Sequence, residues 1–345
     1  MNVTLRDIAE RGGVSLKTVS RVINKEPQVS SKTREKIERI IEEIGYQPNN
    51  IARSLKKNKT NTIGYIIPDI SNQFFGIAGK AIETILRKKG YSLVISSTHN
   101  TPEHEVETLK LFASQKVDGI IFATLGETKE FIRHYLNRFD IPIVTIDNKI
   151  QDLDLDSILH DNFNGAFLLT KHLIQHRHQQ IAFVGGPLNQ TSGHLRYQGY
   201  KKALQEAGIP FDEKLVKIGN WQIKSGYDLV SDLMGSGNRF TSLLAANSYM
   251  ALGCLRALRK NGLKVPRDIA MVSFDNFDFT EVTDPPLTTL RSMESKIGIA
   301  AAECLLSNIE DRSRGKKPVE ILIPARLCIR ESCGCKLKNK KTRIC

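Results

Sequence analysis

The sequence predicts a multi-domain chain: a three-helix N-terminal domain, a short connecting segment, and an α/β body of two subdomains, each built on a parallel sheet. Three observations lead to this prediction. The 345 residues exceed what one hydrophobic core usually holds. Basic residues are concentrated at the two ends of the chain. From residue 61 the pattern changes to apolar strands that alternate with amphipathic helices.

The charge distribution indicates a nucleic-acid-binding module attached to a domain with another task. Residues 1–60 carry 13 Lys and Arg against 7 Asp and Glu, and residues 324–345 carry 7 against 1, so each segment has a net charge of +6. The 263 residues between them hold 30 basic and 29 acidic side chains, a net charge of +1. An evenly cationic membrane-binding protein would have a different distribution.

The first 45 residues have the pattern of three short helices. Thr4 and Asp7 begin a helix that ends at two glycines, Ser15 caps a second helix reaching about Asn24, and a third runs from about residue 31 to 44. Isoleucines at 37, 40, 41 and 44 share one face and close a small core. Two helices joined by a glycine-containing turn form a helix-turn-helix pattern, which places residues 1–48 in a DNA-binding domain.

The second helix offers a short, polar and basic face. Lys17 and Arg21 are candidates for reading base edges, because Arg is the usual partner of guanine. The other candidates for DNA contact in this domain are Thr4, Ser15, Leu16, Thr18, Ser20 and Asn24. The alternative is that these are ordinary solvated residues on surface helices.

Residues 49–60 are polar with one short helical pattern, and alone they are expected to be unfolded. On DNA, a helix here would lie in a minor groove, with Leu55 wedged between base pairs. Asn49, Ala52, Arg53 and Lys56 are the other candidates for DNA contact in this segment. The alternative is a flexible basic linker.

The body shows two series of buried strands separated by helices. In the first series we expect strands at 62–67, 91–95, 119–122 and 143–146, with helices near 73–89, 102–116 and 127–138. In the second we expect strands at 181–184, 242–245 and 270–274, with helices near 162–176, 191–207, 223–234 and 247–261. Ligands of such sheets bind at the carboxyl ends of the strands, which here predicts a cleft between the subdomains.

Polar residues follow these strands where a ligand site is expected. Asp147, Asn247 and Asp275 each come directly after a strand, and Arg196 lies in the helix after the glycines at 185 and 186. Carboxylates, an amide and a guanidinium are good partners for a polyhydroxylated ligand, and Trp221, Phe74 or Phe75 would stack on a sugar ring. A single Asp after a strand is more often a helix cap, so the prediction depends on their convergence.

Residues 1–60, called the head from here on, resemble the N-terminal part of the lactose/galactose repressor (LacI/GalR) family of bacterial transcriptional regulators. The segments that carry the resemblance are residues 4–9, 13–15, 18–24, 33–37, 45–49 and 52–55. The resemblance implies that the helix at 15–24 enters the major groove and that residues 49–56 form a hinge helix that folds on the operator. It also implies that Leu55 opens the central step of a pseudo-palindrome.

The body is similar to that family's effector domain, which is itself like periplasmic sugar-binding proteins. The matching segments are residues 68–75, 117–121, 195–200, 219–221, 246–253, 274–276 and 285–289. The resemblance implies that Asp147, Arg196, Asn247 and Asp275 hydrogen-bond the effector while Trp221 stacks on it. Many members have an arginine where Asn148 stands here, which makes Asp147 the least secure of these assignments.

The resemblance also implies three crossings between subdomains, near 160–163, 288–291 and 320–322. We therefore expect residues 61–160 and 291–320 in an N-subdomain, residues 161–290 and 321–332 in a C-subdomain, and a basic tail at 333–345. The tail lacks the apolar heptads of a tetramerising coiled coil, so a homodimer is expected.

No enzyme motif is visible: the chain has no phosphate-binding glycine loop, no dinucleotide-binding glycine motif and no nucleophile elbow. We expect no cofactor. The histidines at 172, 176 and 178 have no acidic or cysteine partner nearby in sequence, and the cysteines at 328, 333, 335 and 345 have an unusual spacing for zinc. Solvated histidines and a redox-silent tail are the better interpretations, so no metal site is expected.

The sequence therefore predicts a repressor of a sugar catabolic or uptake operon that binds double-stranded operator DNA as a homodimer and is switched by a sugar-like effector. A purine or a phosphorylated metabolite stays open as the effector. A cytoplasmic location and no membrane association are expected, because no apolar run of 18 residues and no signal peptide is visible. The alternative is a sugar-binding receptor of transport type without a DNA function.

Overall fold

A computed structural model describes residues 3–46, 59–139, 141–291, 293–311 and 317–335. The chain divides into two compact units, residues 1–60 and 61–345, each of which is described by itself. In the described ranges, no helix combines the length and the apolar character needed to cross a membrane.

The N-terminal unit contains three helices: α1 (Leu5–Gly12), α2 (Leu16–Ile23) and α3 (Ser31–Glu43). Gly13 adopts a left-handed φ of 62° and ends α1, a conformation that glycine adopts without a Cβ clash. The Ser15 hydroxyl accepts the Thr18 N–H at 3.2 Å and caps α2. The buried core of the unit consists of Ile8, Ala9, Val19, Val22 and Ile37. Its sequence pattern therefore produces the expected three-helix packing.

The first subdomain of the body has a six-stranded sheet in the order β11-β5-β4-β3-β1-β2, and every pairing is parallel. Its strands are β1 (Thr62–Ile67), β2 (Ser92–Ser97), β3 (Gly119–Phe122), β4 (Ile143–Ile146), β5 (Asp156–His160) and β11 (Glu320–Ile323). Its helices are α5 (Gln73–Lys88), α6 (Pro102–Ser114), α7 (Lys129–Arg138) and α13 (Glu294–Glu310).

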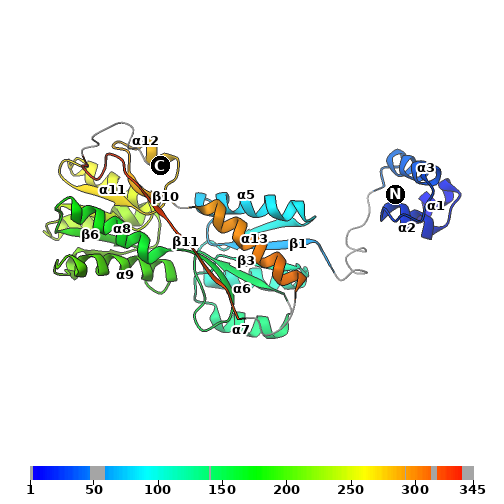
Figure 1. Cartoon of the computed structure of the whole chain (residues 1–345), viewed down its shortest axis with the longest axis horizontal. Coiled ribbons are helices and arrows are strands. Elements are labelled where there is room, and N and C mark those ends of the chain that lie inside the picture. Colours follow the sequence, from blue (N-terminus) through cyan, green and yellow to red (C-terminus); the bar gives the residue numbers. More distant parts are fainter. Residues whose placement is uncertain (1–2, 47–58, 140, 292, 312–316, 336–345) are drawn as a thin grey trace. The chain divides into compact units, whose positions relative to one another are not determined.

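Two separate cores cover the two faces of this sheet. Ile63, Tyr65 and Ile67 of β1 pack with α5 and α13, whereas Ile66 belongs to the core shared with α6 and α7. This alternation follows from the two-residue repeat of a strand. Figure 1 shows α13 beside α5, although more than 200 residues separate them in the chain.

The second subdomain repeats the plan with the strand order β12-β10-β9-β8-β6-β7. Its strands are β6 (Ile181–Gly185), β7 (Val216–Ile218), β8 (Ser242–Ala245), β9 (Ala270–Ser273), β10 (Thr288–Arg291) and β12 (Arg326–Cys328). Its helices are α8 (Asn162–Gln175), α9 (Thr191–Glu206), α10 (Ile223–Gly235), α11 (Ser248–Lys260), α12 (Phe279–Val282) and the 3-10 turn η1 (Glu213–Leu215). One edge departs from the parallel plan, because β12 runs antiparallel to β10.

The chain passes between the subdomains three times, and three of the expected boundaries are displaced. Arg291, expected in the N-subdomain, is the last residue of β10 and pairs with Arg326 in the second sheet. The passages lie between β5 and α8, between β10 and α13, and between β11 and β12. Residues 321–323, expected in the C-subdomain, pair with β5 in the first sheet because β11 continues to Ile323. Residues 333–335, expected in a tail, pack against the second subdomain, where Cys333 is 2% exposed.

Candidate functional site

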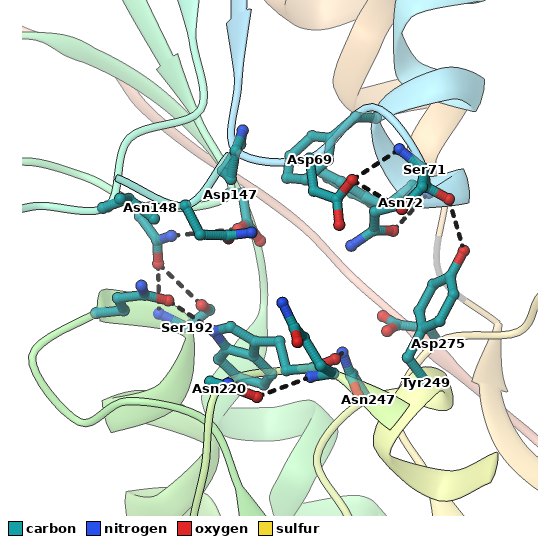
Figure 2. A pocket seen from close by; sticks show the side chains of 18 of the residues that line it. Asp69, Ser71, Asn72, Asp147, Asn148, Ser192, Asn220, Asn247, Tyr249 and Asp275 are labelled. Carbon is teal, nitrogen blue, oxygen red and sulfur yellow. Dashed lines mark hydrogen bonds between the residues drawn. The ribbon is translucent and has the colours of Figure 1, made fainter. Parts of the chain in front are cut away.

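A cavity of about 340 Å³ lies between the two subdomains of the body, at the carboxyl ends of both sheets. Figure 2 shows Asp147 and Asn148 on one side, with Ser192, Asn220 and Asn247 facing them and Asp275 at a third edge. All seven residues that the sequence assigned to effector binding line this cavity: Phe74, Phe75, Asp147, Arg196, Trp221, Asn247 and Asp275.

The two acidic residues occupy matching positions in the two sheets. Asp147 follows β4 and Asp275 follows β9 after one residue, and each has a φ of 65°. This left-handed conformation is rare outside glycine, although Asp tolerates it better than most residues. In both subdomains the backbone therefore turns sharply at the strand end and leaves a carboxylate at the cavity.

Arg196 joins several parts of the cavity wall. It is 4% exposed, and its Nε donates to Asn162 Oδ1 at 2.8 Å while its Nη1 donates to the backbone carbonyl of Ala246. Its guanidinium carbon lies 3.7 Å from the centre of the Phe274 ring. These contacts fix the guanidinium from three directions, which suits a group that must hold a geometry before a ligand arrives.

Burial raises the pKa of both cavity aspartates, and the positive charge of Arg196 opposes this effect. Burial raises the pKa of Asp147 to about 6, opposed by the positive charge of Arg196 and reinforced by Asp275. Burial also raises the pKa of Asp275, against the effects of Arg196 and of the Ser248 backbone N–H. The ionised form of either carboxyl group offers hydrogen-bond acceptors at the cavity wall.

Trp221 and Asn247 are held by each other and by their neighbours. The Asn247 amide donates to the Trp221 carbonyl at 3.0 Å, and its Oδ1 accepts the Met250 N–H at the start of α11. The indole N–H of Trp221 donates to Gln190 Oε1 at 2.7 Å. A Cβ on Gly186 would lie 2.1 Å from the indole, so the ring packs directly on a glycine backbone. Asn247 is thus a helix cap as well as a cavity residue.

Asn148 connects the two subdomains at one side of the cavity. Its Oδ1 accepts both the backbone N–H and the hydroxyl of Ser192 at 2.9 Å, while its amide donates to the Thr124 carbonyl at 3.1 Å. On another side, the Tyr249 hydroxyl donates to the Ser71 carbonyl at 3.1 Å. Side-chain contacts on two sides of the cavity therefore hold the subdomains together (Figure 2).

His160 is a cavity residue that the sequence did not reveal. It is 1% exposed, its ring lies 5.4 Å from that of Phe74, and neither ring nitrogen has a hydrogen-bond partner. Burial, followed by the charge of Arg196, lowers its pKa to about 3, so the imidazole is neutral. The strand that ends at His160 was not predicted. A polar residue at the end of that strand is the signal that would have identified His160 as a cavity residue.

Glu105 positions the loop that carries Leu125 to the cavity. The buried carboxylate accepts the Leu125 N–H at 2.6 Å and the Thr128 hydroxyl at 2.7 Å. Burial raises its pKa to about 7, against the lowering effect of these hydrogen bonds. The folded state therefore holds this proton more tightly than the unfolded chain does.

A pH-dependent stability difference is expected between the wild type and Glu105→Gln. Because the folded pKa is the higher one, the stability contributed by Glu105 is fully present below about pH 4.5 and is lost as the pH rises through about 7, by up to ~3 kcal/mol. Melting temperatures at pH 5 and pH 8 check this: the variant should gain on the wild type at pH 8. Glu107→Gln, on the exposed face of the same helix, is the control, and equal pH profiles for wild type and Glu105→Gln would contradict the prediction.

The predicted DNA-contact residues of the head that the structure describes lie on α2 and at the start of α1. Leu16, Lys17 and Asn24 are exposed, and Arg21 is half-buried with its Nε 3.7 Å from a carboxylate oxygen of Glu26. Ser15 and Thr18 bond each other at the α2 cap, Thr4 bonds Asp7, and Ser20 accepts from Asn24. The predicted contacts Asn49, Ala52, Arg53, Leu55 and Lys56 lie outside the described residues.

Comparisons with known proteins identify both units. Residues 4–49 match the family described as bacterial regulatory proteins, lacI family, and residues 60–331 match periplasmic binding proteins and sugar binding domain of LacI family. The chain is 34% identical to the HTH-type transcriptional repressor PurR of Vibrio atlanticus (92% of this chain, 95% of that protein). It is also 34% identical to the HTH-type transcriptional regulator DegA of Bacillus subtilis (96% and 98%).

Solved structures agree in fold. A lac repressor dimer bound to operator and the anti-inducer ONPF matches with a TM-score of 0.86 at 29% identity, covering 96% of this chain and 99% of that one. A complex of the transcriptional regulator CelR with cellobiose matches with a TM-score of 0.74 at 29% identity, over 96% and 99% of the chains. A regulator from Enterococcus faecium with bound ribose matches with a TM-score of 0.70 at 30% identity, over 79% and 98%.

A helix-turn-helix head on a periplasmic-binding-protein-like body defines a DNA-binding transcriptional regulator, and the predicted fold class is confirmed. The chain belongs to the LacI family of bacterial transcriptional regulators. It is a DNA-binding repressor of that family and not an enzyme, and the alternative of a transport receptor without a DNA function was wrong.

Proposed function

We propose that this repressor acts as a homodimer on a pseudo-palindromic operator and that a neutral, sugar-like effector in the cavity switches its affinity for DNA. The observation that carries the effector part is the convergence of Asp147, Arg196, Asn247 and Asp275 around one cavity beside an indole ring. Carboxylate and side-chain amide groups form hydrogen bonds with hydroxyl groups, and the indole ring covers the apolar face of a sugar ring. The proposed partner, operator DNA, implies a cytoplasmic protein.

The charge of the cavity supports a neutral ligand over a phosphorylated one. Three carboxylates line it, those of Asp69, Asp147 and Asp275, against the two cations Arg196 and Lys224. An anionic ligand would meet net repulsion in a partly desolvated site, where charges interact more strongly than in water. The solved relatives with cellobiose and ribose also support a sugar.

A purine base is the second candidate. Phe74 and Trp221 both line the cavity, and two aromatic rings suit a flat heterocycle as well as a pyranose. The unpartnered ring nitrogens of His160 would bond either ligand. The hydroxyl-rich ligand is preferred because a purine would use fewer of the carboxylate oxygens as hydrogen-bond acceptors.

The proposed switch is a change of angle between the subdomains. Three short passages connect the subdomains, and the contacts of Asn148 and Tyr249 join them beside the cavity. A ligand that bonds both walls favours one angle, and the paired segments that follow each head would transmit it to DNA. The required coupling is about 1–3 kcal/mol.

Ligand and DNA measurements together test the proposal. Thermal shifts of the full chain are recorded with neutral sugars, sugar phosphates, sugar acids and purines, since a ligand of the folded state raises its melting temperature. DNA selected by the protein from a random pool is then titrated with and without the active ligand. A neutral sugar is expected to raise the melting temperature and to change the DNA affinity. A response to purines alone would overturn the proposed sugar-like effector. A selected DNA site without two-fold symmetry would overturn the proposed binding as a homodimer to a pseudo-palindrome.

Arg21→Ala is expected to relax base specificity, because the half-buried Arg21 lies on α2 and has a guanidinium suited to guanine. The expected loss on the preferred sequence is about 1–3 kcal/mol, with little loss on random DNA. Fluorescence anisotropy on both DNAs at fixed salt measures it. Arg39→Ala, an exposed arginine on α3, is the matched control. Equal losses of Arg21→Ala on both DNAs would refute a reading role.

A further inference from the structure

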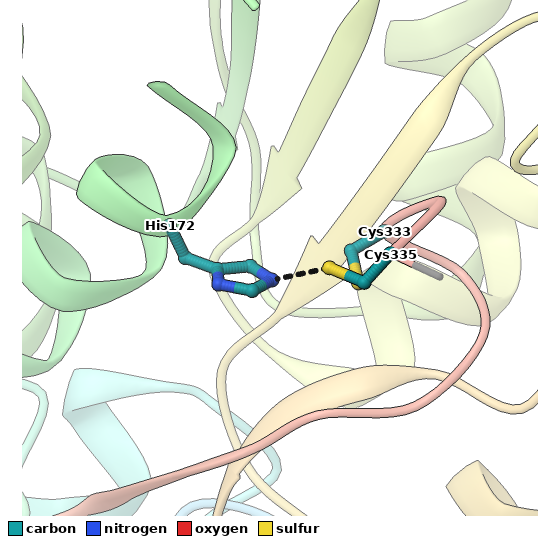
Figure 3. Close-up of side chains that lie close together, drawn as sticks. All are labelled: His172, Cys333 and Cys335. Carbon is teal, nitrogen blue, oxygen red and sulfur yellow. Dashed lines mark hydrogen bonds between the residues drawn. The ribbon is translucent and has the colours of Figure 1, made fainter. Parts of the chain in front are cut away.

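Two histidines and two cysteines from distant parts of the chain meet where the end of α8 lies beside the segment that follows β12. The Cys335 Sγ lies 3.2 Å from His172 Nε2, 2.8 Å from His176 Nε2 and 2.8 Å from Cys333 Sγ. The ligand atoms of His172, Cys333 and Cys335 all lie within 4.8 Å of one another. Figure 3 shows the imidazole of His172 directed from α8 at the two thiols of the C-terminal segment.

Local structure places both pairs on the same spot. His172 and His176 are four residues apart near the end of α8, so they share one face, and their ring centres are 4.7 Å apart. Gly334 has a φ of 75°, and this left-handed turn brings the two flanking cysteines together. The Cys333 side chain packs in a core with Leu169 and Leu173 of α8, which fixes the segment against that helix.

We propose that His172, His176, Cys333 and Cys335 form a tetrahedral zinc site. Cys333 donates to Cys335 Sγ, and the Nε2 atoms of both histidines lie against the same sulfur, so a single cation at this point would bind all four groups. Imidazole and thiolate are the ligands that zinc prefers, with bonds of about 2.0–2.3 Å that place the ligand atoms ~3.3–3.8 Å apart. The ligand atoms of His172, Cys333 and Cys335 already lie within 4.8 Å of one another, and His176 joins them through its 2.8 Å contact with Cys335 Sγ.

The site is structural. Four protein ligands leave no open position for a water or a substrate. The metal would join the segment after β12 to the end of α8, two parts of the chain that are more than 150 residues apart. The sequence did not suggest this site, because the cysteines that complete the ligand set of the histidine pair lie at the far end of the chain.

A neighbouring histidine and a distant cysteine provide matched controls. His178 is two residues from His176, but its Nδ1 lies 3.0 Å from the Thr241 hydroxyl and takes no part in the cluster. Cys304 lies on α13 in the first subdomain and contacts Asp156. His178→Ala and Cys304→Ser therefore change the same residue types outside the proposed site.

The test uses the full chain, expressed without a polyhistidine tag and purified with zinc and a reductant. Inductively coupled plasma mass spectrometry after gel filtration is expected to give one zinc per chain for the wild type, His178→Ala and Cys304→Ser. His176→Ala and Cys335→Ser should lose most of it. Cobalt(II) added to the metal-free protein should give the visible absorption of a tetrahedral site and a sulfur-to-cobalt band, both absent from Cys335→Ser.

Zinc should also raise the melting temperature of the wild type and of both controls, but not that of His176→Ala. His176 is exposed and lies at the end of α8, so this variant is expected to fold even if Cys335→Ser does not. Sub-stoichiometric zinc in the wild type, or equal zinc in wild type and His176→Ala, overturns the proposal. A disulfide mapped by peptide mass spectrometry to Cys333 and Cys335, with no zinc uptake under reductant-free conditions, would assign the pair to a disulfide instead and overturn the proposal.

Discussion

Arg196→Met is expected to lose about 3–5 kcal/mol of unfolding free energy. The substitution keeps much of the side-chain volume but removes a buried positive charge beside two carboxylates, those of Asp147 and Asp275. It also leaves Asn162 Oδ1 and the Ala246 carbonyl without their donor. Urea denaturation followed by circular dichroism measures the loss as a lower midpoint at an unchanged slope.

The matched control is Arg256→Met, which removes an exposed arginine from α11 and should change stability by less than about 0.5 kcal/mol. A loss below ~1 kcal/mol for Arg196→Met would contradict the structural role described for its guanidinium. Sequence reasoning treats Arg196 only as a ligand contact. The structure adds that the same side chain holds the cavity together, so its removal is a poor test of effector binding alone.

Asp275→Asn is the sharper test of the effector site, and its affinity for the active sugar is expected to fall by about 30–150-fold. The change preserves shape but removes the charge that strengthens hydrogen bonds to ligand hydroxyls. Because burial raises the pKa of Asp275, the neutral variant should be at least as stable as the wild type near neutral pH. Calorimetric titration with the sugar identified by thermal shift gives the affinity.

DNA affinity in the absence of the sugar should be unchanged in Asp275→Asn, while the sugar-dependent shift in DNA affinity is lost. Asp154→Asn is the control, since Asp154 is exposed in the loop between β4 and β5 and does not line the cavity. An unchanged sugar affinity in Asp275→Asn would remove this residue from the site. A loss of DNA affinity without sugar would show that the body controls the head independently of the ligand.

The sequence predicts the strands of the body where their apolar pattern is continuous. β1, β3, β4 and β8 begin and end at the expected residues. Other elements were not predicted, because they are short, carry polar residues or lie after the clear alternation of strands and helices ends. These are the strands β5, β7, β10, β11 and β12 and the helix α13. Pairings such as that of β11 with β5 join residues more than 150 positions apart, which local patterns do not encode.

The same limit applies to the cavity. Asp147, Asn247 and Asp275 were predicted because polar residues that end apolar strands stand out in a sequence. His160 ends a strand of mixed composition and did not stand out, whereas Asn148 was noticed only because the resemblance leads one to expect an arginine there. The hydrogen bonds of Asn148 with Ser192 join the two subdomains, and only the tertiary structure reveals them. They give this asparagine a structural function.

The antiparallel strand β12 also bears on the solubility of the protein. It is three residues long and covers the open side of β10, pairing Thr289 with Cys328 and Arg291 with Arg326. Without it, the backbone N–H and C=O groups of β10 would form an exposed sheet edge next to the buried Leu290. Such an edge is a template for pairing with other chains, so this short strand protects the second subdomain from self-association and aggregation.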